Sequence, residues 1–85
     1  MDTITLDHPI TVEGREVKEI TLRRPKVREA RDARKKHKDP ADQEIELVSQ
    51  LSGLPPSAIE EFDIADYSKI QEVLAGFFGS SETTA

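Results

Sequence analysis

Large apolar residues are distributed very unevenly along this 85-residue chain, and this distribution limits the folds that it can adopt. Residues 45–78 hold 13 of the 21 Ile, Leu, Val and Phe residues, whereas residues 23–44 hold only one, Val27. The total is about a quarter of the chain, above the level of about one fifth that marks disordered proteins. We therefore expect one folded domain over residues 1–79 whose core is built mainly from the C-terminal half.

The first 22 residues predict a β-hairpin over residues 3–22. Gly14 supplies the turn, because glycine readily adopts positive φ. Pro9 marks a break in the first strand, and Val17 is out of phase with the second, which predicts a bulge or a later strand start there. A lone hairpin is marginally stable in water, so it must pack on something else. The apolar residues that alternate with polar ones are Ile4, Leu6, Ile10, Val12, Ile20 and Leu22.

Helical signals fill the rest of the chain. Residues 26–38 predict a basic, exposed helix, since only Val27, Ala30 and Ala33 could attach it to a core. A helical core follows over residues 40–78, with starts at Asp39-Pro40 and near Asp63 or Asp66, and stops at Gly53 and Gly79. We expect an α+β fold in which a small N-terminal hairpin packs against two to three helices, with the basic helix in between. The polar residues 80–85 predict a disordered tail.

The net charge of −5 conceals a strong segregation of charge. Residues 23–38 contain nine Lys and Arg against two acidic residues, a net charge of +7, so the rest of the chain carries −12. The chain is therefore an acidic protein with a basic insert.

The residues that catalysis or metal binding would require do not converge in the sequence. Cysteine is absent, and the two histidines, His8 and His37, lie at a strand break and in a run of lysines, where a solvated side chain is the better interpretation. The carboxylate pairs Glu44/Glu46 and Glu60/Glu61 point to different sides or are adjacent, so neither forms a site. We expect no enzyme activity, no metal and no cofactor. No apolar run reaches the ~18 residues needed to cross a bilayer, and the first residues lack the pattern of a signal peptide. The sequence therefore predicts a soluble cytoplasmic protein that does not enter membranes.

Two groups of residues are candidates for binding a partner. The aromatic group contains Phe77 and Phe78, which are adjacent and cannot both face the same way on one helix, so either one is exposed and available for contact or the helix end folds both back. The basic group either contacts acidic protein surface on a partner or is an exposed face neutralised by the chain's own acidic half. Nucleic acid ranks third, because no aromatic residue lies between residues 23 and 38 to stack on bases. The candidates are Tyr67, Phe77, Phe78, Arg28, Arg31, Arg34 and Lys35.

Several short blocks, in order, resemble a known family. Residues 4–14 (ITLDHPITVEG), 20–27 (ITLRRPKV), 51–62 (LSGLPPSAIEEF), Asp66-Tyr67 and 73–78 (VLAGFF) are similar to the tail assembly chaperones of Mu-like and related contractile-tailed phages. Each block is weak alone, but their order and spacing are fairly specific. The stretch Arg28–Lys38 does not match.

The resemblance implies a non-enzymatic chaperone that binds the phage tape measure protein, a long, apolar, largely helical chain. It implies that the chaperone keeps this partner soluble in the cytoplasm of the bacterial host and is absent from the mature virion. The tail tube protein and a longer frameshift product of the same gene are implied as further candidate partners. The rival hypothesis is a small nucleic-acid-binding regulator that uses the basic helix over residues 23–38.

Overall fold

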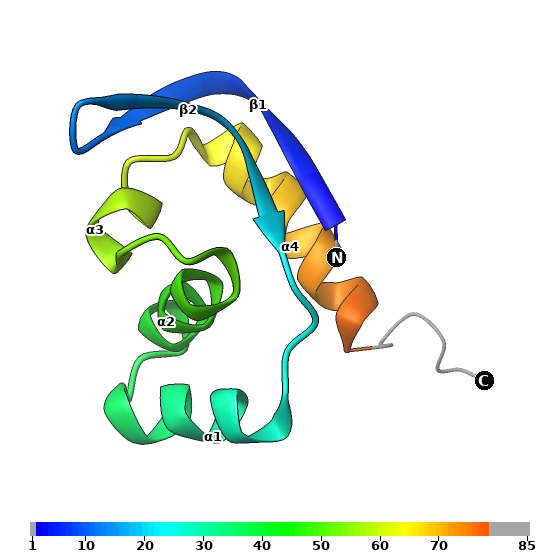
Figure 1. The fold of residues 1–85 in the computed structure, drawn as a ribbon. Helices are drawn as coiled ribbons and strands as arrows, with labels where there is room; N and C mark the ends of the chain where they lie inside the picture. The colour runs from blue at the N-terminus through cyan, green and yellow to red at the C-terminus, as the bar shows by residue number, and fades with distance from the viewer. Residues whose placement is uncertain (1, 79–85) are drawn as a thin grey trace.

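The computed structural model describes residues 2–78 and shows an N-terminal hairpin followed by helices (Figure 1). The predicted α+β fold is confirmed. The expected tail over residues 80–85 lies outside the described residues. The elements are β1 (Asp2–Val12), β2 (Arg15–Leu22), α1 (Val27–Lys36), α2 (Pro40–Ser52), α3 (Pro56–Ile59) and α4 (Ile64–Phe77).

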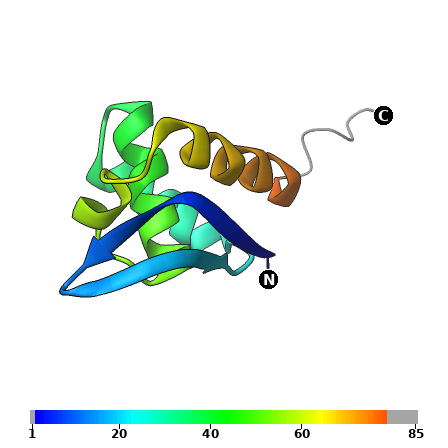
Figure 2. The same ribbon diagram turned by 90° about the horizontal axis from the view of Figure 1, so that it is seen from above.

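The hairpin connects α4 to α2, two helices that do not pack directly on each other. β1 packs on α3 and α4, β2 packs on α2, and α1 packs on α2. Among the described residues, no Cα of α4 comes within 8 Å of a Cα in α1 or α2. Seen from above, the hairpin lies along one side of the molecule, and α4 runs alongside it on the other (Figure 2). The backbone of α4 is therefore separated from those of α1 and α2, and any contact between them is made by side chains.

The two strands form an antiparallel pair with a long irregularity in β1. Thr5 pairs with Glu19 and Ile10 pairs with Val17, so four residues of β1 face the single residue Lys18. The prediction of a bulge or a later strand start at Val17 is therefore wrong, because Val17 pairs in register with Ile10. The irregularity lies in β1 instead, in the residues between Thr5 and Ile10, which include Pro9. Proline has no N–H to donate to the neighbouring strand, which explains why the regular pairing of β1 is interrupted at this point.

The turn follows directly from its sequence. Glu13 and Gly14 both have positive φ, 51° and 80°, the geometry of the tight two-residue turns that match the twist of paired strands. Glycine adopts this conformation without a steric penalty, so the predicted position of the turn is confirmed.

α2 and α4 begin at the capping residues that the sequence predicts, and α2 ends at the predicted glycine, whereas the stop predicted at Gly79 lies outside the described residues. The Asp39 carboxylate accepts the N–H of Ala41 at 2.8 Å, and the Asp63 carboxylate accepts that of Ala65 at 3.0 Å. Gly53 ends α2 in the left-handed conformation at φ 81°. Each cap satisfies backbone groups that the end of a helix leaves unpaired.

One continuous core joins the hairpin to α2, α3 and α4. It is supplied by both strands and by three helices, which matches the concentration of apolar residues in the C-terminal half. α1 contributes only Ala33 to the buried hydrophobic residues, and Val27, expected to attach it, is 79% exposed. The core residues are Ile4, Leu6, Ile10, Ile20, Leu22, Leu47, Val48, Leu51, Ala58, Ile59, Phe62, Ile70 and Leu74.

Candidate partner-binding site

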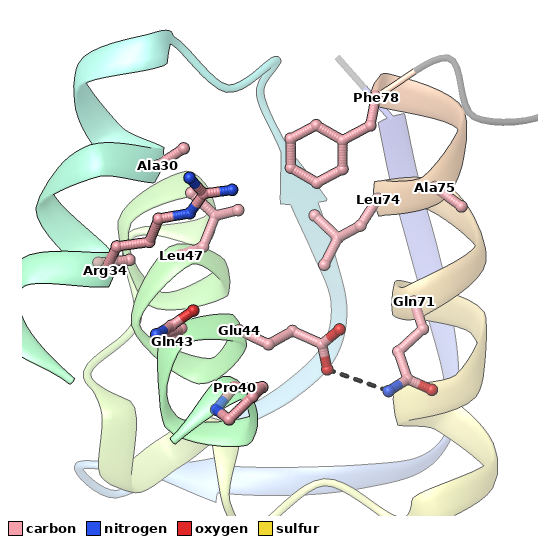
Figure 3. Close-up of a pocket in the computed structure, with 11 residues that line it drawn as sticks. Ala30, Arg34, Pro40, Gln43, Glu44, Leu47, Gln71, Leu74, Ala75 and Phe78 are labelled. Atoms are coloured by element: carbon pink, nitrogen blue, oxygen red, sulfur yellow. Dashed lines mark hydrogen bonds between the residues drawn. The ribbon is translucent and has the colours of Figure 1, made fainter. Parts of the chain in front are cut away.

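An open groove of about 510 Å³ separates α4 from α1 and α2 (Figure 3). Its lining is mainly apolar, with Leu47 and Leu74 at its base and alanines on the walls. Polar side chains, among them Glu44 and Gln71, line the end near the start of α2. The lining residues are Ala30, Ala33, Arg34, Pro40, Gln43, Glu44, Leu47, Gln71, Leu74, Ala75 and Phe78.

A second hollow of about 310 Å³ extends the first toward the start of α1. The two share Ala30, Arg34 and Phe78, so they form one continuous surface, which we call the groove. Val27 lines the second hollow, which explains how a large aliphatic side chain comes to be exposed at the start of a helix. The groove thus runs past the whole of the apolar side of α1.

The two adjacent phenylalanines have different environments, the first of the two alternatives that their adjacency left open. Phe78, at the end of α4, is 57% exposed and points into the groove toward α1 (Figure 3). Phe77 is half-buried against the core, and the Arg24 guanidinium carbon lies 5.3 Å from the centre of its ring. That distance is typical of a cation–π contact. Phe78 is therefore the aromatic side chain available to a partner.

Tyr67 lies beside the groove and does not line it. Its hydroxyl donates to Glu44 Oε1 at 2.8 Å, and Gln71 Nε2 donates to the same oxygen at 3.0 Å. Burial, together with the hydrogen bond and charge of Glu44, raises the pKa of Tyr67. This cluster links α2 to α4 across one end of the groove, so Tyr67 helps to hold α4 against α2.

One face of α1 is neutralised by the chain's own acidic residues. The Lys36 ammonium lies 3.3 Å from Glu46 and 3.4 Å from Asp32. His37 Nε2 lies 3.2 Å from the other Glu46 oxygen. Hydrogen bonds from Gln50, His37 and Lys36 hold the pKa of Glu46 below its ordinary value. On this face, therefore, Lys36 and His37 are paired with acidic residues of the same chain.

The start of α1 is held by a buried carboxylate. Glu29 forms an ion pair with the Arg23 guanidinium and accepts the Lys26 N–H at 2.8 Å. The Arg23 hydrogen bond is the main cause that lowers the pKa of Glu29. These contacts fix the point where the chain leaves β2 and enters α1.

The four basic candidates lie on the opposite, exposed side of α1. Within residues 2–78, Arg28, Arg31, Arg34 and Lys35 make no ion pair within 4.0 Å. Arg34 and Arg31 line the groove, whereas Arg28 and Lys35 do not; these two line a separate hollow, which Arg31 borders as well. Of the four, Arg34 and Arg31 are therefore the cations that a molecule bound in the groove would meet.

Asp66 is a buried carboxylate that the sequence analysis overlooked. It is fully buried and accepts the N–H of Asp7 at 3.0 Å and that of His8 at 2.9 Å. Burial alone would raise its pKa, but these two N–H groups and Lys69, at 3.4 Å, hold the pKa below its ordinary value. Its burial could have been predicted from the sequence, because Asp66 lies on the same helix face as Ile70 and Leu74, at intervals of four residues.

The described residues offer little for other kinds of site. No group of three or more His, Asp or Glu within residues 2–78 is placed to hold a metal ion. None of the helices in that range is long and apolar enough to cross a membrane.

Comparison with known proteins identifies the family. No curated protein and no solved structure gives a significant match to the chain. A family profile described as "Phage tail assembly chaperone proteins, E, or 41 or 14" matches residues 3–79, nearly the entire sequence. The match spans the hairpin, all four helices and the groove between them. It confirms the resemblance, and the chain belongs to the phage tail assembly chaperone family.

Proposed function

We propose that this chaperone binds apolar helical segments of the phage tape measure protein and keeps them soluble until the tail tube assembles around them. The observation that carries the proposal is the open apolar groove between α4 and the α1–α2 pair, with Phe78 exposed at its edge. We propose that the protein acts in the cytoplasm of the bacterial host and leaves before the virion is complete.

The groove has the shape and chemistry that an apolar helix requires. Its exposed apolar side chains are Phe78, at 57%, and Val27, at 79%, whereas Leu47 and Leu74 are only 6% and 4% exposed. Burial of apolar surface contributes about 25 cal/mol per Å², so a few aliphatic side chains of a partner would suffice for reversible binding. Helices commonly dock into such grooves through apolar residues spaced along one face.

The rest of the surface suits a solubilising role. Acidic residues outnumber basic ones by 17 to 12, and the excess negative charge lies outside the basic segment. Net charge of one sign makes complexes repel each other and slows aggregation. A partner helix bound in the groove would bury its apolar face, and the complex would present this charged surface to water instead.

Co-expression with the tape measure protein of the same phage tests the proposal. The soluble yield of the tape measure protein should rise with the wild-type chaperone and should rise much less with Phe78→Ala. Ile64→Ala is the matched control, because Ile64 is also exposed on α4, at 78%, but lies outside the groove. An equal yield with and without the chaperone would refute the function, and equal effects of the two variants would refute the site.

A nucleic-acid-binding regulator is the second candidate, and the unpaired cations of α1 favour it. Contacts between cations and phosphates weaken steeply as salt is added. Retention of duplex DNA at ~0.15 M salt would support this candidate. The tail tube protein and a longer product of the same gene stay proposed partners, which co-purification from infected cells would identify.

A further inference from the structure

We propose that the groove selects an amphipathic helix whose acidic residues lie along one flank only, the flank that faces Arg31 and Arg34. The inference rests on the proposed function and specifies its partner. It predicts which segments of a long apolar chain the protein would bind and in which rotational orientation they would lie.

A helix is the occupant that the groove walls favour. Both walls are helices, α1 on one side and α4 on the other, and the base between them is apolar. None of the residues that line the groove within the described chain belongs to β1 or β2, so no strand edge is presented there to an extended peptide. Docking through one apolar stripe is the usual way for such a surface to bind a helix.

The two walls differ in charge. The α1 wall carries Arg31 and Arg34, which have no ion-pair partner among residues 2–78. The α4 wall lines the groove with uncharged side chains: Gln71, Leu74, Ala75, Phe77 and Phe78. A helix in the groove would therefore meet positive charge along one flank and no charge along the other. Carboxylates on the flank toward α1 would complete ion pairs that the free protein leaves unmade.

Two further charged side chains line the groove: Lys26, just before α1, adds to the positive charge on that side, and Glu44 is negative. Glu44 lines the far end, but one of its oxygens accepts hydrogen bonds from both Tyr67 and Gln71. Its carboxylate thus already has two donors within the protein, whereas the guanidinium groups of Arg31 and Arg34 have no acidic partner in the described chain. Selection by charge should come from the α1 wall.

Binding of designed peptides to the full chain tests the inference. The probes are three amphipathic helices of ~20 residues, long enough to form a helix, that share one leucine stripe. They carry Glu, Gln or Lys along one flank of that stripe. The chain is used as wild type, as R31E/R34E, and as the matched control R28E/K35E, which makes the same change in charge on the same helix away from the groove.

Wild type should bind the Glu peptide about 10-fold more tightly than the Lys peptide at low salt, the effect of two partly exposed ion pairs. R31E/R34E should reverse this preference, and R28E/K35E should preserve it. The preference should shrink at ~0.5 M salt, where the Debye length is only a few ångströms. Circular dichroism of each variant would confirm that the fold is retained.

Other outcomes would overturn the inference in distinguishable ways. If wild type binds the three peptides equally, the groove does not select charge, although the proposed function survives. If both double variants lose the preference for the Glu peptide equally, the whole basic face attracts the peptide. If duplex DNA also competes with the peptide, that face binds phosphates. If no peptide binds, while the tape measure protein is still solubilised, the groove is not the site.

Discussion

The hairpin–α4 junction and the α1–α2 junction are held together by different kinds of contact. At the first, β1 and α4 share a continuous apolar core, and the one buried carboxylate, Asp66, is satisfied by two backbone N–H groups. At the second, Ala33 is the only buried apolar residue of α1, and polar contacts join the two helices: Lys36 pairs with Glu46, and Gln50 donates to Asp32. The two walls of the groove therefore differ in how firmly they are fixed.

This difference indicates how such a small protein can be both folded and adaptable. Apolar burial is not screened by salt, whereas exposed ion pairs are worth only about 0–1 kcal/mol each and weaken as salt is added. α4 should keep its position, while α1 can shift to fit helices of different width. Five experiments, from the largest expected effect to the smallest, can break or sharpen this comparison.

Substitution of core leucines should have the largest effect. Leu51→Ala and Leu74→Ala each remove a side chain that is only 4% exposed, and each should lower the free energy of unfolding by about 2–5 kcal/mol. Val27→Ala, on α1, removes an exposed side chain and should cost less than about 0.5 kcal/mol. Urea denaturation measures all three. A neutral result at either leucine would mean that the core lies elsewhere.

Removal of the Asp66 carboxylate should rank second. Asp66→Ala leaves the N–H groups of Asp7 and His8 without their carboxylate acceptor, so the thermal midpoint should fall clearly. Asp66→Asn keeps one acceptor oxygen, so its thermal midpoint should fall less. Differential scanning calorimetry measures both variants, and an unchanged midpoint for Asp66→Ala would show that these contacts do not stabilise the junction.

The same carboxylate should make stability depend on pH. Because the pKa of Asp66 is lowered in the folded protein, its contribution is present at neutral pH. The contribution should be lost as the pH falls below the ordinary carboxyl range near about 4 and through the folded-state pKa. The difference in stability between wild type and Asp66→Asn should therefore narrow on acidification. A difference that is constant with pH would contradict the assignment.

Loss of the Tyr67 hydroxyl should have a smaller effect. Tyr67→Phe removes the 2.8 Å hydrogen bond to Glu44 and should cost about 1 kcal/mol, the typical contribution of one hydrogen bond. Gln71 still donates to the same oxygen, which limits the loss. Chemical denaturation measures the change, and Gln71→Ala on the same cluster is a suitable comparison. A more stable Phe variant would show that the bond does not hold α2 to α4.

The smallest effect is expected in the local dynamics of α1. Amide hydrogen exchange should be faster over Arg31–Lys36 than over Glu46–Leu51, and faster still in α1 at ~0.5 M salt, which screens its ion pairs. Protection of α1 equal to that of α2 and independent of salt would remove the difference between the two junctions.

Local sequence signals predicted the elements well because their physical causes are local. A capping carboxylate, a proline at the first turn or a glycine with positive φ acts within a few residues, so Asp39, Gly53 and Asp63 could be recognised directly. The hairpin turn at Gly14 belongs to the same class. Adjacency on a helix also indicated that Phe77 and Phe78 could not both face the same way.

The features that escaped prediction depend on contacts between distant residues. Asp66 bonds to backbone groups 58 and 59 positions away, and no periodicity reveals such a partner. The four basic candidates could not be divided into groove-lining and outward pairs without knowing where α4 lies. Val27 was taken as an anchor of α1 because it is apolar, but the neighbouring wall at that point is an open groove.

The Asp66 contact also has a consequence for how this protein can diverge. The carboxylate holds the main chain at residues 7 and 8 through amide groups, which every amino acid except proline possesses. The His8 side chain is mostly exposed and takes no part in that contact, so mutation can alter it freely. A lineage could therefore change the chemistry of this part of its surface, and with it the proteins that it meets, while the junction beneath is inherited unchanged.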